Sequence, residues 1–594
     1  MPGDRGPRRR LLAALVGVLA LGLIVSTIWT ACAGPSGTAP RGTKAARSRQ
    51  SAKPVSPVPN PTVPSAQNGD SAAQNGDSAV RARAIASRLS DVDLVGQMLM
   101  PFVYGDAPTS VSVATRTANL SRTGAPTPAA IIQRYRLGGV ILVRQSADDP
   151  TAATNTGSNI ESPDQLRRLT TGLQKTARAL PAGVPLIIGT DQEGGTVTRI
   201  RDGVTRLPSA MTFGAADDPE LTERATAASG AELAALGLDV DFAPDADVIG
   251  GPGNTVIGSR SFGADPPLVS RQVAAAVKGY LSAGVAPSLK HFPGHGHTDV
   301  DSHVAVAVLT QSLASLRKND LAPFEAGIKA GSPIVMSGHL DTQAIDPGTP
   351  ASLSGKVLTG LLRNTLGFTG MVVTDGLDMK ALTDKYGPAE VAVRAVLAGN
   401  DLLLLPPNVQ AAQQGLLAAL KSGRLSRARA VDAVTHVLTV KLRSKPAVPA
   451  MSTLHSAAHQ AVVDQVAAKA VTVFRGACEG ALIRGPVTIT GGASEARSSL
   501  TTALRAYGIR FGPGGDSIRL AGYGDTASDL RPATVTVATD VPYILASARS
   551  KTLLATYSNV DSSMRALAKV LVGKAKAPGR SPVPVAGLPN SACL

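Results

Sequence analysis

Eight short apolar runs, alternating with segments of helical length, constrain the fold of this chain more than any other feature. Each run has the length of a buried strand and is bounded by Gly, Pro or polar residues. The runs are LVGQMLMPFV (94–103), GGVILV (138–143), VPLIIGT (184–190), LDVDFAP (238–244), VAPSLKH (285–291), PIVMSGH (333–339), GMVVTD (370–375) and NDLLLLP (400–406). Amphipathic segments such as residues 162–180 separate them. This order predicts an α/β fold with a (β/α)8 TIM-type barrel over residues 85–444, with an open doubly wound sheet as the alternative.

A barrel fold also predicts where functional side chains lie, because they gather at the C-terminal ends of its strands. Polar residues do follow five of the predicted strands. They are Asp191 after the third run, Asp245 and Asp247 after the fourth, Lys290 and His291 at the end of the fifth, His339 and Asp341 after the sixth, and Asp375 after the seventh. The two patterns agree, so we expect the active site at this end of the barrel.

The regions on either side of the barrel have different characters. Residues 1–32 combine Arg8–Arg10 with an apolar run over 11–29 and the small residues of TACAG, which is typical of an export signal or membrane anchor. Cys32 is a candidate lipidation site. Residues 33–84 are rich in Pro, Ser, Ala and Gly, and they predict a disordered linker. Residues 451–594 alternate helical and strand-like segments, which predicts a smaller α/β sandwich domain with a structural or substrate-bordering role.

Charge and cysteine content limit the partners and the compartment. The net charge is +16, but residues 1–53 hold nine Lys/Arg against Asp4, so half of the excess lies in the tail. No nucleic-acid-binding motif accompanies the charge, so nucleic acid is not an expected partner. Apart from Cys32, the chain has Cys478 and Cys593, which we expect to form a disulfide in an exported protein. We therefore expect the folded part outside the cytoplasm, anchored to the cell membrane through a lipid or the apolar segment.

The stretch KHFPGHGHTDVDSH (290–303) holds four of the eight histidines and allows three interpretations. The H-x-H pair His295 and His297 resembles a zinc motif, but Val300 stands where a further histidine would be expected. Those two histidines could instead hydrogen-bond the backbone of a loop that turns at its glycines. In the third interpretation, Asp301 orients His303 as an acid/base for a reaction at Asp375. A carboxylate paired with an acid/base suits double displacement at an acetal carbon.

KHFPGHG…DSH, together with GTDQEGGTVTR (189–199) and IGSRSFG (257–263), resembles glycoside hydrolase family 3. More narrowly, it is similar to the β-N-acetylglucosaminidase branch that trims cell-wall fragments. The resemblance implies that Asp375 is the nucleophile, that His303 is the general acid/base and that Asp301 orients it. It also implies that Asp191, Arg260, Lys290 and His291 hold the terminal sugar, without metal or cofactor. One departure is His297, which stands where the branch commonly has Asp in G-H-G-D-T.

The leading prediction is a retaining exo-β-N-acetylglucosaminidase acting on small carbohydrate or muropeptide substrates. Two alternatives remain at this point. In a β-GlcNAc or β-glucoside phosphorylase, phosphate would replace water as the acceptor, and a histidine acid/base would repel that anion less than a carboxylate. A wall-glycan-binding lipoprotein would keep the barrel without catalysis.

Overall fold

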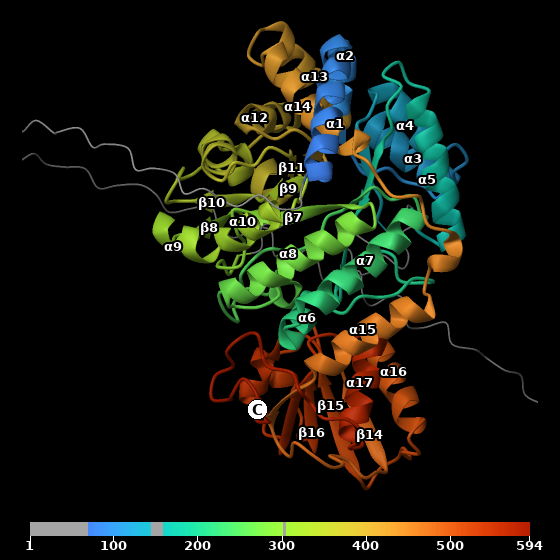
Figure 1. The fold of residues 1–594 in the computed structure, drawn as a ribbon, viewed down its shortest axis with the longest axis vertical. Coiled ribbons are helices and arrows are strands. Elements are labelled where there is room, and N and C mark those ends of the chain that lie inside the picture. Colours follow the sequence, from blue (N-terminus) through green and yellow to red (C-terminus); the bar gives the residue numbers. More distant parts are fainter. Residues whose placement is uncertain (1–68, 144–158, 301–304, 594) are drawn as a thin grey trace, which may run out of the picture. The chain divides into compact units, whose positions relative to one another are not determined.

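The computed structural model describes residues 69–143, 159–300 and 305–593. Eight parallel strands alternate with helices over the first part of this range (Figure 1). The strands are β1 (Leu99–Met100), β2 (Gly139–Ile141), β3 (Ile187–Thr190), β6 (Val240–Asp241), β7 (Ala286–Phe292), β9 (Ile334–Ser337), β11 (Met371–Thr374) and β12 (Leu403–Leu404). Seven of them lie within the predicted runs and are shorter, whereas β7 has the predicted length but is shifted by one residue, to Phe292. Residues 94–97 of the first run instead belong to helix α2 (Asp91–Gln97).

The eight strands close into a barrel. Six form a sheet in the order β11-β9-β7-β6-β3-β2, and β1 pairs with β12. Parallel bridges from Phe102 to Ile141 and from Val373 to Leu402 join the two sets into one ring. The closed ring confirms the barrel and rejects the open sheet.

Helices cover the outside of the ring, and apolar residues fill both sides of its strands. The main covering helices are α5 (Pro163–Arg178), α7 (Pro219–Ala235), α8 (Pro266–Ser282), α10 (Leu321–Lys329), η4 (Lys356–Thr365), α12 (Pro388–Ala398), α13 (Val409–Lys421) and α14 (Arg427–Leu442). Met100, Ile141, Val240, Met336 and Val373 pack inside the barrel. Pro begins α5, α7 and α8, each after an Asp or Ser whose side chain accepts a backbone N–H, which explains where these helices start.

The linker prediction is wrong for residues 69–84. Helix α1 (Gly69–Arg88) covers them and lies along α14, as Figure 1 shows. Ala82 and Ala86 are fully buried at a spacing of four, and the Ser78 hydroxyl donates to the Leu442 carbonyl at 3.3 Å. Small side chains on one face allow the helix to approach its neighbour closely, which composition alone did not reveal. Residues 1–68, including the predicted export segment, Cys32 and most of the linker, lie outside the described residues.

A five-stranded sheet forms the core of the C-terminal region, with the order β13-β17-β16-β15-β14. Its strands are β13 (Thr472–Arg475), β14 (Val487–Gly491), β15 (Asp516–Ala521), β16 (Val535–Ala538) and β17 (Thr552–Ala555). Helices α15 (Ala457–Ala470), α16 (Ser494–Arg505) and α17 (Asp561–Leu571) pack on it through one apolar cluster. The predicted disulfide between Cys478 and Cys593 is present. It closes a segment of 115 residues, so it ties the end of the chain to the start of this α/β unit.

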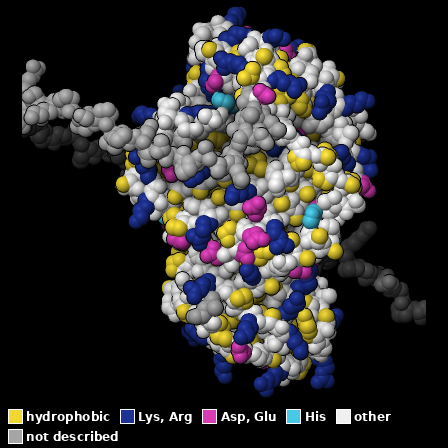
Figure 2. Space-filling model, in the orientation of Figure 1, with side chains coloured by type: hydrophobic (Ala, Val, Ile, Leu, Met, Phe, Trp, Pro, Cys, Tyr) yellow, Lys and Arg dark blue, Asp and Glu magenta, His cyan; other side chains and the backbone are white. Residues whose placement is uncertain are grey.

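Charged side chains are dispersed over the face shown in Figure 2, where Lys and Arg lie among acidic, apolar and polar groups. No helix within the described residues is both long and apolar enough to cross a bilayer.

Candidate functional site

The C-terminal ends of β3, β6, β7, β9 and β11 bring the predicted polar residues to one end of the barrel. Asp191 directly follows β3, and Asp375 directly follows β11. Lys290 and His291 lie in β7, near its end. The Lys290 ammonium reaches Asp191 Oδ1 at 3.0 Å, so side chains from two strands meet.

A buried network of four charges lies at the centre of this end. The Arg260 guanidinium donates to both carboxylate oxygens of Glu193, with Nε–Oε2 at 2.8 Å and Nη2–Oε1 at 2.9 Å. Lys290 Nζ lies 2.6 Å from Glu193 Oε1 and 3.0 Å from Asp191 Oδ1. The Lys290 side chain is 3% exposed and that of Glu193 is 6% exposed, whereas Asp191 is 17% exposed. Asp191 is therefore the member of this network most open to a ligand.

Electrostatics stabilise the charged forms of this network. Burial alone would raise the pKa of Glu193, but the charges of Arg260 and Lys290 outweigh it and lower the pKa to about 2. Against the effect of burial, Glu193 and Asp245 raise the pKa of Arg260, and Asp191 and Glu193 raise the pKa of Lys290. Both cations therefore stay protonated and act as hydrogen-bond donors.

Glu193 is a site residue that the sequence analysis did not single out. It lies on β4 (Gln192–Gly194), which forms a hairpin with β5 (Val197–Thr198). Successive side chains of an extended segment point to opposite faces, so Asp191 and Glu193 share one face. That spacing within GTDQEGGTVTR is the signal that could have identified it.

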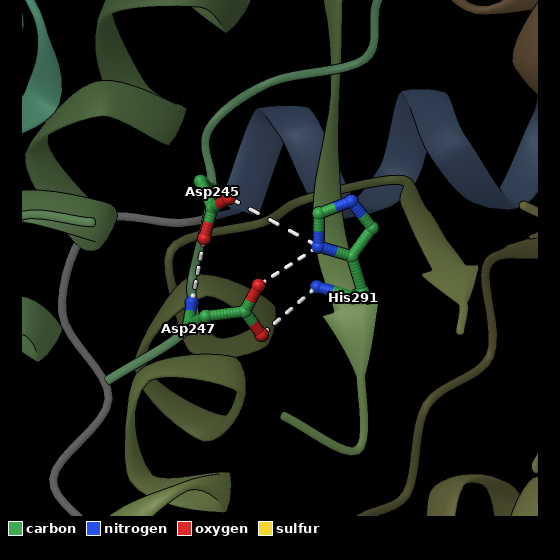
Figure 3. Close-up of side chains that lie close together, drawn as sticks. All are labelled: Asp245, Asp247 and His291. Carbon is green, nitrogen blue, oxygen red and sulfur yellow. Dashed lines mark hydrogen bonds and ion pairs between the residues drawn. The ribbon is translucent and has the colours of Figure 1, made fainter. Parts of the chain in front are cut away.

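His291 makes a second buried cluster with Asp245 and Asp247, shown in Figure 3. Its Nδ1 lies 2.8 Å from Asp247 Oδ2, and its backbone N–H donates to Asp247 Oδ1 at 3.2 Å. Burial and the nearby Arg260 charge lower the pKa of His291 to about 4, so the ring is neutral at neutral pH. Nδ1 then carries the hydrogen that it donates to Asp247, and Nε2 accepts from Arg260 Nη2 at 3.4 Å.

The pKa values of the two aspartates of this cluster are both raised by burial. For Asp245, the adjacent Asp247 charge adds to this effect, and the pKa lies well above its ordinary value. Burial raises the pKa of Asp247 only to about 6, and Asp247 stays ionised. It accepts backbone N–H groups from both His291 and His295, at 3.2 and 2.6 Å. Asp247 therefore acts as the internal anchor of the segment that follows β7.

Asp245, Asp247 and His291 offer three atoms close enough together to hold a metal ion. Hydrogen-bond donors of the protein already take these positions, because the His291 Nδ1–H faces Asp247 and the Arg260 guanidinium Nη2 lies 3.5 Å from Asp245 Oδ2. A divalent ion would have to displace the ring proton and lie next to a guanidinium. The donor set therefore fits an internal hydrogen-bond network better than a metal ion.

The FPGHG segment, which holds two of the glycines at which the loop turns, is buried. A side chain at Gly296 would come within 1.9 Å of the Val248 carbonyl oxygen, and His295 is 2% exposed. The Thr298 hydroxyl lies 3.1 Å from His295 Nδ1, and His297 Nδ1 lies 2.7 Å from Asp320 Oδ1. Both histidines thus help to hold the loop through hydrogen bonds to side chains, whereas the second interpretation of this stretch expects bonds to the loop backbone.

His295 allows a test through the pH dependence of stability. Burial lowers its pKa to about 4 from 6.5, so its contribution to stability is present above pH 6.5 and is lost as the pH falls through about 4. From pH 7 to pH 5, we expect wild type to lose about 2 kcal/mol of unfolding free energy relative to a His295→Asn variant. Urea unfolding at each pH measures this difference. A difference that does not change with pH would show that the imidazole is not held neutral.

Asp375 belongs to the same group of residues. Its backbone N–H donates to the Ser337 carbonyl at 2.9 Å, and its Oδ1 accepts the Gly376 N–H at 2.8 Å. The negative charge of Asp375 raises the pKa values of His291 and His295, in opposition to burial. Asp375 therefore lies near both rings. The predicted acid/base pair, Asp301 and His303, lies outside the described residues.

The turn that carries Arg260 has a partner that sequence reasoning missed. Arg260 ends the 3-10 turn η2 (Gly258–Arg260), and the Ser259 hydroxyl donates to the buried Asp540 carboxyl. Asp540 follows β16 and is 281 residues away in sequence. No local pattern could have indicated this contact.

Comparison with known proteins agrees with this geometry. Residues 93–440 match the family described as the N-terminal domain of glycosyl hydrolase family 3. "Beta-hexosaminidase A" of Pseudoalteromonas piscicida is 32% identical over 371 residues, which are 58% of this chain and 60% of that protein. "Beta-hexosaminidase LpqI" of Mycobacterium tuberculosis is 32% identical over 361 residues, covering 57% of this chain and 92% of that protein. This chain thus spans about 60% of the length of the Pseudoalteromonas relative and nearly all of the mycobacterial one.

Solved structures extend the likeness beyond the barrel. A glycoside hydrolase family 3 β-N-acetylglucosaminidase from Paenibacillus sp. str. FPU-7 has a TM-score of 0.71 at 32% identity, covering 84% of this chain and 99% of that chain. The β-glucoside phosphorylase BglX also has a TM-score of 0.71, but at 21% identity. The second likeness therefore shows the fold alone.

Proposed function

Because this chain belongs to glycosyl hydrolase family 3, we propose that it is a retaining exo-β-N-acetylglucosaminidase that releases terminal β-linked GlcNAc from peptidoglycan-derived fragments. The observation that carries the proposal is the buried network of Asp191, Glu193, Arg260 and Lys290 at the same barrel end as Asp375. The relatives named as β-hexosaminidases and the Paenibacillus β-N-acetylglucosaminidase support this choice of sugar.

Two displacements at the anomeric carbon account for the reaction. In the first, an Asp375 oxygen bonds to C1 while the C1–O bond to the leaving group breaks, and the leaving oxygen takes a proton from His303. In the second, His303 takes a proton from water, the water oxygen bonds to C1, and the ester to Asp375 breaks. Asp301 orients the His303 ring in both steps. The net result is hydrolysis with retained configuration, and no metal or cofactor takes part.

The network and the neutral His291 prepare the site for the terminal sugar. Arg260 and Lys290 donate to hydroxyl oxygens, and Asp191 accepts from a hydroxyl. The carboxylates already neutralise both cations, so a neutral sugar binds without leaving a buried charge unpaired. Such preorganised polar groups direct binding energy toward the reacting carbon.

We also propose that the protein works outside the cytoplasm and is held at the membrane by its N-terminal segment or by lipid on Cys32. The Cys478–Cys593 disulfide supports this location, because disulfides persist mainly in oxidising compartments. Cell fractionation tests the location. Labelling cells with a lipid analogue, and comparing the wild type with a Cys32→Ser variant, tells the lipid anchor from the apolar segment. A protein found entirely in the cytoplasm would contradict the proposal.

The activity is tested with the purified full-length protein and 4-nitrophenyl β-GlcNAc. We expect turnover that EDTA does not change, and NMR should show β-GlcNAc as the first product. Added phosphate should not yield GlcNAc-1-phosphate, which separates hydrolysis from phosphorolysis. Binding of wall glycans without turnover would instead indicate a binding protein. Comparing muropeptides with chitobiose then identifies the preferred aglycone.

A further inference from the structure

His339 follows β9 and lies next to the end of β11, the strand that leads to Asp375; Figure 1 shows the two strands side by side. The side chain is fully buried, so it does not contact a ligand directly. Its two ring nitrogens have defined neighbours. Nδ1 lies 2.8 Å from the Ser352 hydroxyl, and Nε2 lies 2.8 Å from the Gly376 carbonyl oxygen.

These neighbours determine where the ring hydrogen lies. A carbonyl oxygen can only accept a hydrogen bond, so Nε2 must carry hydrogen and donate it to Gly376. In the neutral ring, Nδ1 then accepts from the Ser352 hydroxyl. Both ring nitrogens are thus used for hydrogen bonds inside the protein.

Gly376 connects this ring to the proposed nucleophile. Its N–H donates to Asp375 Oδ1 at 2.8 Å, while its carbonyl accepts from His339. The next backbone N–H, that of Leu377, donates to the Leu404 carbonyl at 3.0 Å. Gly376 is therefore held at its N–H, at its carbonyl and through the following residue.

A second set of buried hydrogen bonds links the same region through Asn400. The Asn400 amide donates to the Ser352 carbonyl at 2.7 Å and accepts from the Ser337 hydroxyl at 2.7 Å. Ser337 in turn accepts the Asp375 N–H at its carbonyl. The connection therefore begins at the Asp375 backbone and returns to the Asp375 carboxylate through Ser337, Asn400, Ser352, His339 and Gly376. The first four of these intermediate residues are fully buried.

We propose that His339 is a positioning residue that orients the Asp375 carboxylate by holding the carbonyl of Gly376. The proposal rests on the function proposed above, in which Asp375 attacks the anomeric carbon. Losing the donor at Nε2 would leave a buried carbonyl unpaired and free Gly376 to shift. A small displacement of the attacking oxygen slows bond formation more than it weakens sugar binding, because contacts made elsewhere hold the sugar.

The experiment compares His339→Leu and His339→Gln in the full-length protein. For His339→Leu we expect kcat to fall about 100-fold, while KM and the inhibition constant of GlcNAc change by less than about threefold. The Gln amide can still donate to Gly376, so His339→Gln should recover most of the lost kcat. The rate at which a 5-fluoro-GlcNAc fluoride labels the enzyme should follow the same order.

Two further variants keep the result interpretable. Ser352→Ala removes the hydroxyl at Nδ1 without removing a large side chain, and we expect a fall in kcat of several-fold with KM unchanged. His459→Gln removes a partly buried histidine that pairs with Glu232 and should leave kcat unchanged. The acidic and basic limbs of the pH–rate profile should be the same in His339→Gln as in wild type, because the ring holds its proton and transfers none.

The possible outcomes distinguish a failure of this proposal from a failure of the proposed function. An active wild type with an inactive Asp375→Asn variant and an unchanged kcat in His339→Leu would overturn the role of His339 alone. A loss of one limb of the pH profile in His339→Gln would overturn it by showing proton transfer. Equal losses of kcat and of GlcNAc affinity would also overturn it, since they indicate general disruption. A wild type without turnover would overturn the proposed function and this inference together.

Discussion

Replacing Asp375 by Asn is expected to lower kcat by roughly four orders of magnitude, or about 5.5 kcal/mol of barrier. The Asn side chain keeps the shape and can still accept the Gly376 N–H, but it lacks the negative charge and the nucleophilic oxygen. The variant should bind GlcNAc with near wild-type affinity, because Asp191, Arg260 and Lys290 are untouched. Steady-state kinetics and inhibitor binding measure the two effects separately.

Asp378 provides a matched control, because it is a nearby carboxylate that is exposed rather than placed at the strand end. It lies just before the short helix α11 (Lys380–Thr383), whose N-cap is Met379. We expect Asp378→Asn to keep kcat within a fewfold of wild type. An Asp378 variant as inactive as the Asp375 variant would contradict the assignment of the nucleophile.

Covalent labelling makes the Asp375 prediction more specific. Treatment with a 5-fluoro-GlcNAc fluoride followed by peptide mass spectrometry should place the sugar on Asp375. In an Asp375→Ala variant, azide should restore turnover and give the α-glycosyl azide, because azide attacks C1 where the carboxylate stood. If the acetamido group of the substrate acted as the nucleophile instead, wild type would carry no label.

The barrel was predictable because buried parallel strands have a simple local signature. Each strand is covered on both faces, so it appears as a continuous apolar run, and the chain repeats the unit eight times. The polar residues at the strand ends were predictable for the same reason, since Asp191, Lys290 and Asp375 are located by the strands that precede them. The strand bounds were less predictable, as residues 94–97 show, because helix capping at Ser90 competes with an apolar run.

The features that sequence reasoning missed depend on partners far away in the chain. Helix α1 has linker-like composition and is helical where Ala82 and Ala86 pack against α14. The FPGHG segment is rich in turn-forming residues, and it is buried through contacts with Val248 and Asp247. His297 departs from the motif of the resembled branch, and in the structure it pairs with Asp320, 23 residues further along. Composition and spacing carry no information about such contacts.

Removing the carboxylate of Glu193 is expected to be costly in both stability and activity. Glu193→Gln leaves Arg260 and Lys290 buried with one fewer negative charge between them. Breaking a buried pair in this way should lower the free energy of unfolding by about 3 kcal/mol or more. The two cations should also lose their orientation, and we expect kcat/KM to fall about 100-fold. Denaturant unfolding and steady-state kinetics measure the two losses.

Glu390 supplies a control that differs from Glu193 mainly in exposure. It also pairs with two cations, Arg394 at 2.6 Å and Arg424 at 2.7 Å, and its pKa is likewise lowered to about 2. Its side chain is 35% exposed, against 6% for Glu193. Solvent screens such a pair, so Glu390→Gln should cost less than about 1 kcal/mol and leave kcat/KM unchanged. Equal costs at the two positions would show that burial does not determine the energetics of the Glu193 network. A Glu193→Asp variant separates charge from side-chain length. If it keeps most of the stability but loses activity, the site requires the length of the Glu side chain, because that length places Arg260 and Lys290.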